Sequence, residues 1–222
     1  MRILFAALFL LVVGGCAPTA DPEGGDILVI GDSVMAWNRT GGEDVGAVVG
    51  RELNRSVINR AGLGAQIRAG GPAALFGLSI PDQIPPGTWN WVIMNGAAND
   101  LGISCDCIRC DAEIEALIAA DGAQGDIPDL VERAQRQGAQ VVWVGYYKAP
   151  ETRAFQGCRP GLVEVERRIA EFARETDGFY FLDAENVFDP DDRSLFDLDR
   201  THPSPAGSAV IGRYIAETIS EN

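Results

Sequence analysis

The sequence predicts an α/β protein, a three-layer α/β/α sandwich around a central, mostly parallel sheet of five strands. Short apolar segments alternate with amphipathic segments of helical length along the 222 residues. That alternation favours a parallel sheet covered by helices on both faces. Small and polar residues follow several of the apolar segments directly. These residues would lie at the carboxyl ends of the strands, which is the edge where ligands bind in an open parallel sheet.

Five short apolar segments are the predicted strands, each bounded by turn-forming residues. They cover residues 26–30, 56–59, 89–94, 140–146 and 178–182. Helices are expected where apolar residues recur every three or four positions. These segments are residues 42–53, 112–120, 127–137, 161–176 and 205–220.

The first residues are typical of an export signal. Residues 3–13 are eleven consecutive apolar residues, too few for a permanent membrane span. Gly15 and Cys16 follow, and this arrangement resembles the lipobox of bacterial lipoproteins. The resemblance implies a signal peptide at residues 1–15, a lipid on Cys16 and a lipid-anchored protein of the cell envelope or periplasm. The alternative is an ordinary signal with a chance cysteine. Residues 16–25 are the expected tether, and residues 26–222 the globular domain.

The composition, 46% hydrophobic and 23% charged, is that of a globular chain rather than a disordered one. A formal net charge of -14 disfavours binding to nucleic acids, because the chain repels phosphate backbones.

Four cysteines other than Cys16 remain in the exported chain, and two interpretations of them stay open. In an oxidising compartment an even number favours disulfides. Cys105 and Cys107 are too close for an unstrained bond with each other, so we expect one bond within residues 105–110 and one to Cys158. The alternative is a zinc site of four thiolates that includes Cys110.

Four short polar segments follow predicted strands or precede the last helix. Each of them alone is more often a helix cap or a turn. The segments are Gly31-Asp32-Ser33, Asn59-Arg60-Ala61-Gly62-Leu63-Gly64, Asn99-Asp100, and Asp199-Arg200-Thr201-His202. His202 is the only histidine of the chain, and Asp199 can hold its ring in one tautomer.

Together and in this order, the four segments resemble the SGNH hydrolase superfamily, also called the GDSL esterase/lipase family. The resemblance implies a flavodoxin-like fold, with Ser33 as nucleophile, His202 as base and Asp199 as its partner. It implies an oxyanion hole made by the Ser33 backbone, Gly64 and Asn99. Two positions depart from the family: Val34 replaces a leucine, and Ala97 stands where a glycine is common.

The resemblance implies hydrolysis of carboxylic esters through an acyl-enzyme, with small acyl or acetyl esters of carbohydrate or lipid as substrates. It requires neither a metal nor another cofactor. We expect a monomer that meets the membrane only through the lipid on Cys16. An O-acyltransferase with the same three residues and a non-catalytic envelope binding protein are the alternatives. Trp37, Trp89, Trp91, Tyr146 and Tyr147 are candidate pocket walls, although the strand positions of three of them favour the core.

Overall fold

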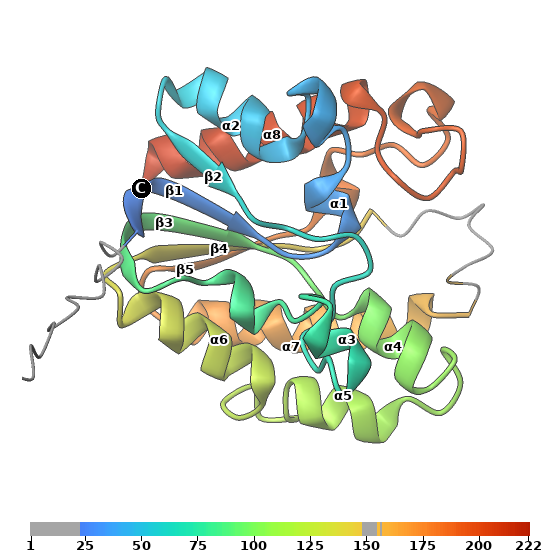
Figure 1. Cartoon of the computed structure of the whole chain (residues 1–222). Coiled ribbons are helices and arrows are strands. Elements are labelled where there is room, and N and C mark those ends of the chain that lie inside the picture. The colour runs from blue at the N-terminus through green and yellow to red at the C-terminus, as the bar shows by residue number, and fades with distance from the viewer. Residues whose placement is uncertain (1–22, 148–154, 156) are drawn as a thin grey trace, which may run out of the picture.

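The computed structural model describes residues 23–147, 155 and 157–222, and its centre is a five-stranded sheet in the order β2-β1-β3-β4-β5 (Figure 1). The strands are β1 (Glu23–Ile30), β2 (Val57–Asn59), β3 (Gly87–Met94), β4 (Gln140–Val144) and β5 (Phe179–Leu182). All neighbouring strands are parallel, so their carboxyl ends meet at one edge. The predicted α/β fold with a parallel sheet is confirmed.

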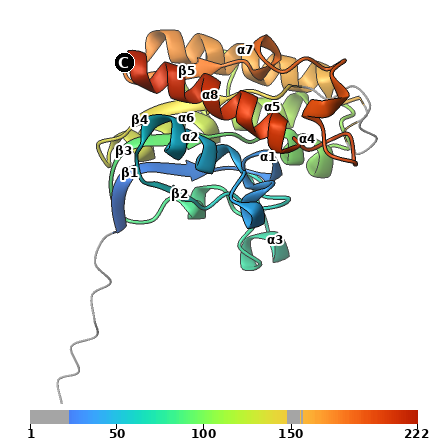
Figure 2. The ribbon, with the colours of Figure 1, turned by 90° about the horizontal axis from the view of Figure 1, so that it is seen from above.

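Helices cover both faces of the sheet. One face carries α2 (Val45–Leu53) and α8 (Pro205–Glu221), which pack against each other. The other carries α6 (Asp126–Gln135) and α7 (Arg159–Glu175), with α5 (Asp111–Leu117) beside α7. Figure 2 looks onto the α2–α8 face and shows α8 lying over the sheet. These two helical layers explain why the strand segments are continuously apolar rather than alternating.

The core lies in the middle of the sheet. Leu28, Val29 and Ile30 of β1 are fully buried, as are Val92 and Ile93 of β3. These two strands pair over seven registered positions, from Glu23 opposite Gly87 to Ile30 opposite Met94. β-branched side chains pack well on such a surface, because it is covered on both sides.

Side-chain caps fix where the two helices of the first face begin. Asp44 accepts the backbone N–H of Ala47 at 3.2 Å at the start of α2. Ser204 accepts the N–H of Gly207 at 3.2 Å, and Pro205 follows it in the first position of α8. Both arrangements satisfy N–H groups that a helix start leaves unpaired.

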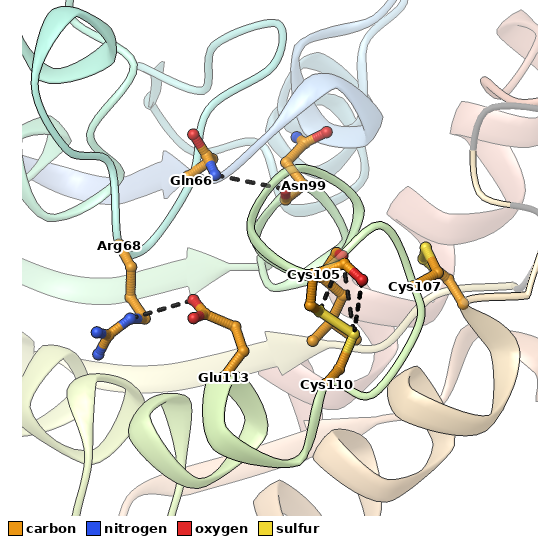
Figure 3. The surroundings of a disulfide bond; sticks show 9 residues. Gln66, Arg68, Asn99, Cys105, Cys107, Cys110 and Glu113 are labelled. Atoms are coloured by element: carbon orange, nitrogen blue, oxygen red, sulfur yellow. Dashed lines mark hydrogen bonds and ion pairs between the residues drawn. A yellow bond between two sulfur atoms is a disulfide. The ribbon is translucent and has the colours of Figure 1, made fainter.

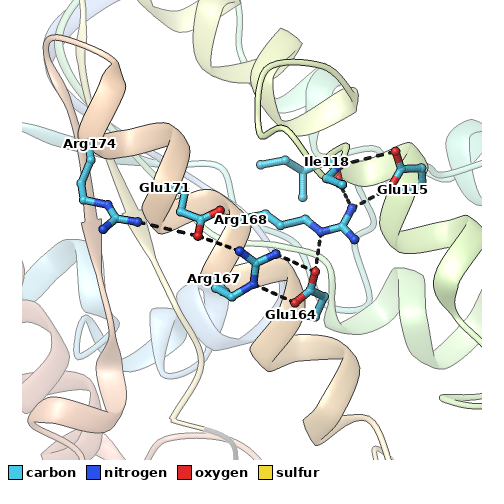
Figure 4. A network of polar contacts seen from close by, with 8 residues as sticks. Glu115, Ile118, Glu164, Arg167, Arg168, Glu171 and Arg174 are labelled. Atoms are coloured by element: carbon cyan, nitrogen blue, oxygen red, sulfur yellow. Dashed lines mark hydrogen bonds and ion pairs between the residues drawn. The ribbon is translucent and has the colours of Figure 1, made fainter.

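A network of charged side chains joins α7 to α5 (Figure 4). Arg168 of α7 contacts Glu115 of α5 and the backbone oxygen of Ile118, both at 2.8 Å. Hydrogen bonds from Arg167 and Arg168 lower the pKa of Glu164 to about 2. The network holds the helix whose first turns border the site described below.

The structure differs from the sequence prediction at several boundaries. β1 begins at Glu23, because its first residues pair with Gly87 and Thr88 of β3; residues 23–25 therefore belong to the sheet and not to the expected tether. β4 ends at Val144 instead of residue 146. Three short helices were not predicted, since they span too few turns to show a periodicity. They are α1 (Ser33–Ala36), α3 (Pro72–Leu75) and α4 (Ala98–Ser104).

Four 3-10 turns complete the described elements: η1 (Arg39–Gly41), η2 (Pro81–Gln83), η3 (Ala184–Asn186) and η4 (Arg193–Leu195). The predicted signal peptide at residues 1–15, Cys16 and residues 17–22 of the tether lie outside the described residues. Within the described part of the chain, no helix has the length and apolar character needed to cross a membrane.

Candidate active site

The serine of the first polar segment lies where the chain turns from β1 into α1. Gly31 makes this turn with a φ of +137°, and a Cβ there would lie 1.9 Å from Oδ1 of Asn95. The backbone N–H of Asp32 donates to the same Oδ1 at 3.0 Å, which fixes this close approach, and the Gly31 N–H donates to Oε1 of Gln83 at 2.7 Å. Asp32 then caps α1 by accepting the Val34 N–H at 2.9 Å. The turn therefore presents Ser33 at the carboxyl edge of the sheet.

The imidazole of His202 lies between the serine and an aspartate. Its Nε2 is 2.7 Å from Oγ of Ser33, and its Nδ1 is 2.5 Å from Oδ2 of Asp199. Oδ1 of Asp199 accepts the backbone N–H groups of Thr201 and His202, both at 2.9 Å. Residues 169 positions apart in the sequence are thus brought into one hydrogen-bonded series.

The carboxyl group of Asp199 is ionised at neutral pH. Burial acts to raise its pKa, but the hydrogen bonds from the His202 ring and from two backbone N–H groups outweigh burial, and the pKa lies below its ordinary value. An ionised carboxylate at Nδ1 keeps the proton on that nitrogen and leaves Nε2 with a lone pair toward Ser33. The series can therefore withdraw a proton from the serine hydroxyl.

The loop that carries the histidine is held from both ends. Arg200 adopts a left-handed φ of +57°, which turns the chain back on itself between Asp199 and His202. The Asp197 N–H donates to the His202 oxygen at 2.8 Å, and the hydroxyl of Tyr147 donates to the Thr201 oxygen at 2.6 Å. These bonds explain how a loop can hold the ring in a single place.

Trp37 was a candidate pocket wall, but it lies against the histidine instead. Its ring stacks on the His202 ring with centroids 3.8 Å apart and an interplanar angle of 4°. The indole N–H donates to Oδ2 of Asp197 at 2.6 Å. Trp89 and Trp91, by contrast, are buried in the core, at 2% and 4% exposure. The stack fixes the ring plane of the histidine.

The two other predicted oxyanion donors lie on neighbouring segments. The Asn99 side chain in α4 is 8% exposed, borders the cavity beside Ser33, and donates one N–H to the Ala65 oxygen at 2.9 Å. The second N–H of the Asn99 side chain makes no hydrogen bond to any residue that the structure describes. Gly64 has a φ of +73°, and its N–H makes no hydrogen bond within the described residues. Gly64 does not border the cavity, whereas Ser33, Asn99 and His202 do.

Asp100 clamps the segment after Gly64 to α4. Its carboxylate is fully buried and accepts the N–H groups of Ile67 at 3.1 Å and of Arg68 at 2.7 Å. Gln66 adds a bond to the backbone oxygen of Asn99, seen in Figure 3. Burial raises the pKa of Asp100 to about 6 against the effect of these N–H groups. The clamp holds the Gly64 and Asn99 segments together.

Ala97, the departure from the family pattern, directly precedes α4 and has a φ of +96°. This left-handed conformation costs a residue with a Cβ about 1–2 kcal/mol, whereas a glycine adopts it freely. Ala97 therefore occupies a strained position directly before the helix that carries Asn99.

A small cavity of about 70 Å³ opens beside Ser33. Its walls combine the polar groups of the site with apolar and aromatic side chains, among them two of the tyrosines expected at a pocket. The lining residues are Asp32, Ser33, Val34, Ala98, Asn99, Tyr146, Tyr147, Phe155, Arg159, Leu162, Thr201 and His202. A pocket for a drug-sized ligand is several times larger, about 300–1,000 Å³.

The four cysteines among the described residues form two disulfides, one inside the 105–110 loop and one leaving it, as the sequence predicts. Cys105 is bonded to Cys110 (Figure 3). Cys107 is bonded to Cys158. With the thiols paired, the four-thiolate zinc site is not formed. Cys158 directly precedes α7, whose residues Arg159 and Leu162 line the cavity. The second bond thus joins the loop after α4 to the cavity wall. No group of three or more metal-ligating side chains occurs among the described residues.

The α/β fold with its parallel five-stranded sheet is shared with SGNH hydrolase structures. Residues 29–210 match the GDSL-like lipase/acylhydrolase family, so the chain belongs to that family and is a hydrolase of ester bonds. No curated protein matches the chain.

Solved structures share the fold at low sequence identity. A candidate SGNH hydrolase from Slackia heliotrinireducens is 20% identical with a TM-score of 0.57, over 89% of this chain and all of that one. A family two carbohydrate esterase from Clostridium thermocellum, solved with cellohexaose, is 18% identical with a TM-score of 0.57, over 90% of this chain and 65% of that one. The lipase Lip_vut3 from a goat rumen metagenome is 17% identical with a TM-score of 0.56, over 86% and 96%.

Proposed function

We propose that the protein is a serine esterase that works through an acyl-enzyme. His202 takes the proton of the Ser33 hydroxyl as Oγ attacks the ester carbonyl, and Asp199 stabilises the imidazolium. The imidazolium then gives its proton to the departing alcohol, and water hydrolyses the acyl-serine with His202 again as base. The observation that carries the proposal is the series of contacts of 2.7 Å and 2.5 Å on either side of the imidazole.

The negative charge on the carbonyl oxygen needs donors that are in place before attack. We assign this role to the backbone N–H groups of Ser33 and Gly64 and to the side chain of Asn99. Neither backbone N–H makes a hydrogen bond within the described segments, so both are available. Loss of one such donor typically lowers kcat about 10²–10³-fold.

The acyl group is short. The cavity beside Ser33 measures about 70 Å³, and Leu162 and Tyr147 form part of its walls. This volume suits an acetyl to butyryl group rather than a fatty chain, for which pockets several times larger are usual. Because a carbohydrate esterase is among the proteins with a similar fold, acetylated carbohydrate is the first natural substrate to test.

A fluorophosphonate probe and a panel of p-nitrophenyl esters test the proposal. We expect the probe to label the native protein and not Ser33→Ala. The His202→Ala variant should lose at least about 10⁴-fold in kcat/KM. Ser220→Ala, the same kind of change near the far end of α8, is the matched control and should retain activity.

Two results would contradict the proposal. Esterase activity that survives His202→Ala means that another base acts, and a native protein without labelling means a binding protein. Transfer of the acyl group to an added sugar alcohol in preference to water would identify an O-acyltransferase. A peak of kcat/KM at acetyl or butyryl esters supports the short acyl group, and Leu162→Ala should move that peak to longer chains.

We further propose that the protein is exported and anchored to a membrane by a lipid on Cys16. Two observations support this placement. An apolar segment precedes Gly15 and Cys16, and the domain holds two disulfides, which persist in oxidising compartments. Metabolic labelling with a fatty acid analogue should mark the wild-type protein and not Cys16→Ala. Labelling of both proteins would refute the anchor.

A further inference from the structure

The hydroxyl of Tyr146 lies between the two segments that carry the proposed nucleophile and oxyanion donor. It donates a hydrogen bond to Oδ2 of Asp32 and accepts the backbone N–H of Ala98 at 3.2 Å. Asp32 directly precedes Ser33, and Ala98 directly precedes Asn99. One phenol oxygen therefore bonds to the neighbour of each of these two groups.

Tyr146 is itself fixed in place. It follows the end of β4, is 8% exposed, and its backbone N–H donates to Oε1 of Glu166 at 2.7 Å. Glu166 lies in α7 and is buried at 6% exposure. Because its backbone is hydrogen-bonded and its ring is buried, Tyr146 can hold the two segments that its hydroxyl contacts at a fixed separation.

The bond to Asp32 belongs to a buried polar network. Asp32 is 2% exposed; its Oδ1 accepts the Asn95 amide at 2.9 Å, and its own N–H donates to the Asn95 oxygen at 3.0 Å. Burial raises the pKa of Tyr146 well above its ordinary value, so the phenol keeps its proton and remains a donor. Removing a member of such a network leaves its partners buried without a hydrogen bond.

We propose that Tyr146 is a positioning residue of the esterase site, whose hydroxyl sets the distance between the Ser33 turn and the helix that carries Asn99. The inference rests on the proposed function, in which attack by Ser33 and stabilisation by Asn99 occur at the same carbonyl group. The hydroxyl acts through Asp32 and Ala98 and takes no part in bond making.

The physical reason is the precision that this chemistry needs. The nucleophile and the oxyanion donor lie on different segments, α1 and α4, and a misplacement of about 1 Å can lower the rate about 10²-fold. Asp100 ties α4 to the segment after Gly64. Among the described contacts, the Tyr146 hydroxyl is the one side-chain group that bonds to both Asp32 and α4.

The test is Tyr146→Phe, which removes one oxygen and keeps the ring. We expect kcat for p-nitrophenyl acetate to fall about 10- to 100-fold with KM within twofold, because the loss is one of transition-state geometry. Tyr180→Phe is the matched control: its hydroxyl bonds to Gln140 at 3.1 Å on β4 and β5, and its kcat should equal that of the wild type.

A double-mutant cycle with Asn99→Ala separates positioning from a merely structural role. If the hydroxyl acts on α4, Tyr146→Phe should lower kcat less in the Asn99→Ala background than in the wild type. A full effect in both backgrounds overturns the inference. So does a lowered free energy of unfolding with unchanged kcat.

If Tyr146→Phe does not fold, Asp32→Asn takes its place in the same cycle. A fall in kcat that shrinks in the Asn99→Ala background supports the inference, and an unchanged kcat overturns it. Failure of the proposed function would give a different result. The wild-type protein would then carry no fluorophosphonate label, or the Ser33→Ala variant would hydrolyse esters as fast as the wild type.

Discussion

The Cys107–Cys158 disulfide should contribute more to stability than the Cys105–Cys110 disulfide, although both lie at the same edge of the sheet. The first closes a loop between cysteines 51 residues apart, and the second joins cysteines 5 residues apart. A crosslink restricts the unfolded chain more when the closed loop is longer. Two double variants test this difference, Cys107→Ala/Cys158→Ala and Cys105→Ala/Cys110→Ala.

The loop lengths give the magnitudes. The chain-entropy relation assigns about 4 kcal/mol to the 51-residue separation and about 2 kcal/mol to the 5-residue one. Urea unfolding followed by tryptophan fluorescence measures both losses on the same scale. We expect the long-range variant to lose about 2 kcal/mol more than the short-range variant.

Equal losses of unfolding free energy in the two double variants, or a larger loss for the short loop, would show that loop closure does not set the contribution of these disulfides. Activity adds a second observation. Cys158 directly precedes the first turn of α7, where Arg159 and Leu162 border the cavity, so the long-range variant should also lose activity below its unfolding transition. Full activity with both cysteines removed would show that the cavity wall holds without the bond.

Three further predictions concern the site and its supports. Trp37→Leu removes the ring stacked on the imidazole and should lower kcat/KM about tenfold with p-nitrophenyl acetate, whereas Trp37→Phe keeps a stacked ring and should lose less; equal losses would show that stacking is not the cause. Burial raises the pKa of Asp100 from 3.8 to about 6, so the folded protein binds this proton more tightly than the unfolded chain does. The stability that the bound proton contributes is lost as the pH rises through that interval. Relative to Asp100→Asn, the unfolding free energy of the wild type should therefore fall by up to about 3 kcal/mol between about pH 4 and pH 6, and parallel curves would contradict the burial argument. Gly207→Ala places a Cβ 2.1 Å from the backbone oxygen of Leu195 and should cost about 2–3 kcal/mol in urea unfolding, while Gly70→Ala, with open space around it, should be close to neutral; similar costs would argue against the close packing of α8.

Much of the candidate site could be predicted because its residues occupy the ends of apolar strands. Ser33 follows β1 and Asn99 follows β3, and parallel strands bring their carboxyl ends to one edge. Asp199 and His202 lie three residues apart, so a short loop suffices to join them. Trp37 and Tyr146 were noted only as candidate pocket walls. Nothing local marks a tryptophan that stacks on a ring 165 positions away or a tyrosine that bonds to an aspartate 114 positions away.

Local signals in the sequence indicate the succession of most strands and helices along the chain, the polar segments at the strand ends and a cysteine spacing that rules out one pairing. These depend on local propensity and on the periodicity of apolar residues, which neighbouring positions record. The side chains that support the site are known only from the folded arrangement: Tyr146 bonds to Asp32 and Ala98, and Asp100 bonds to the backbone of Ile67. The physical reason is that a buried carboxylate takes whichever donors packing brings within about 3 Å, and those donors lie on strands and loops distant in sequence.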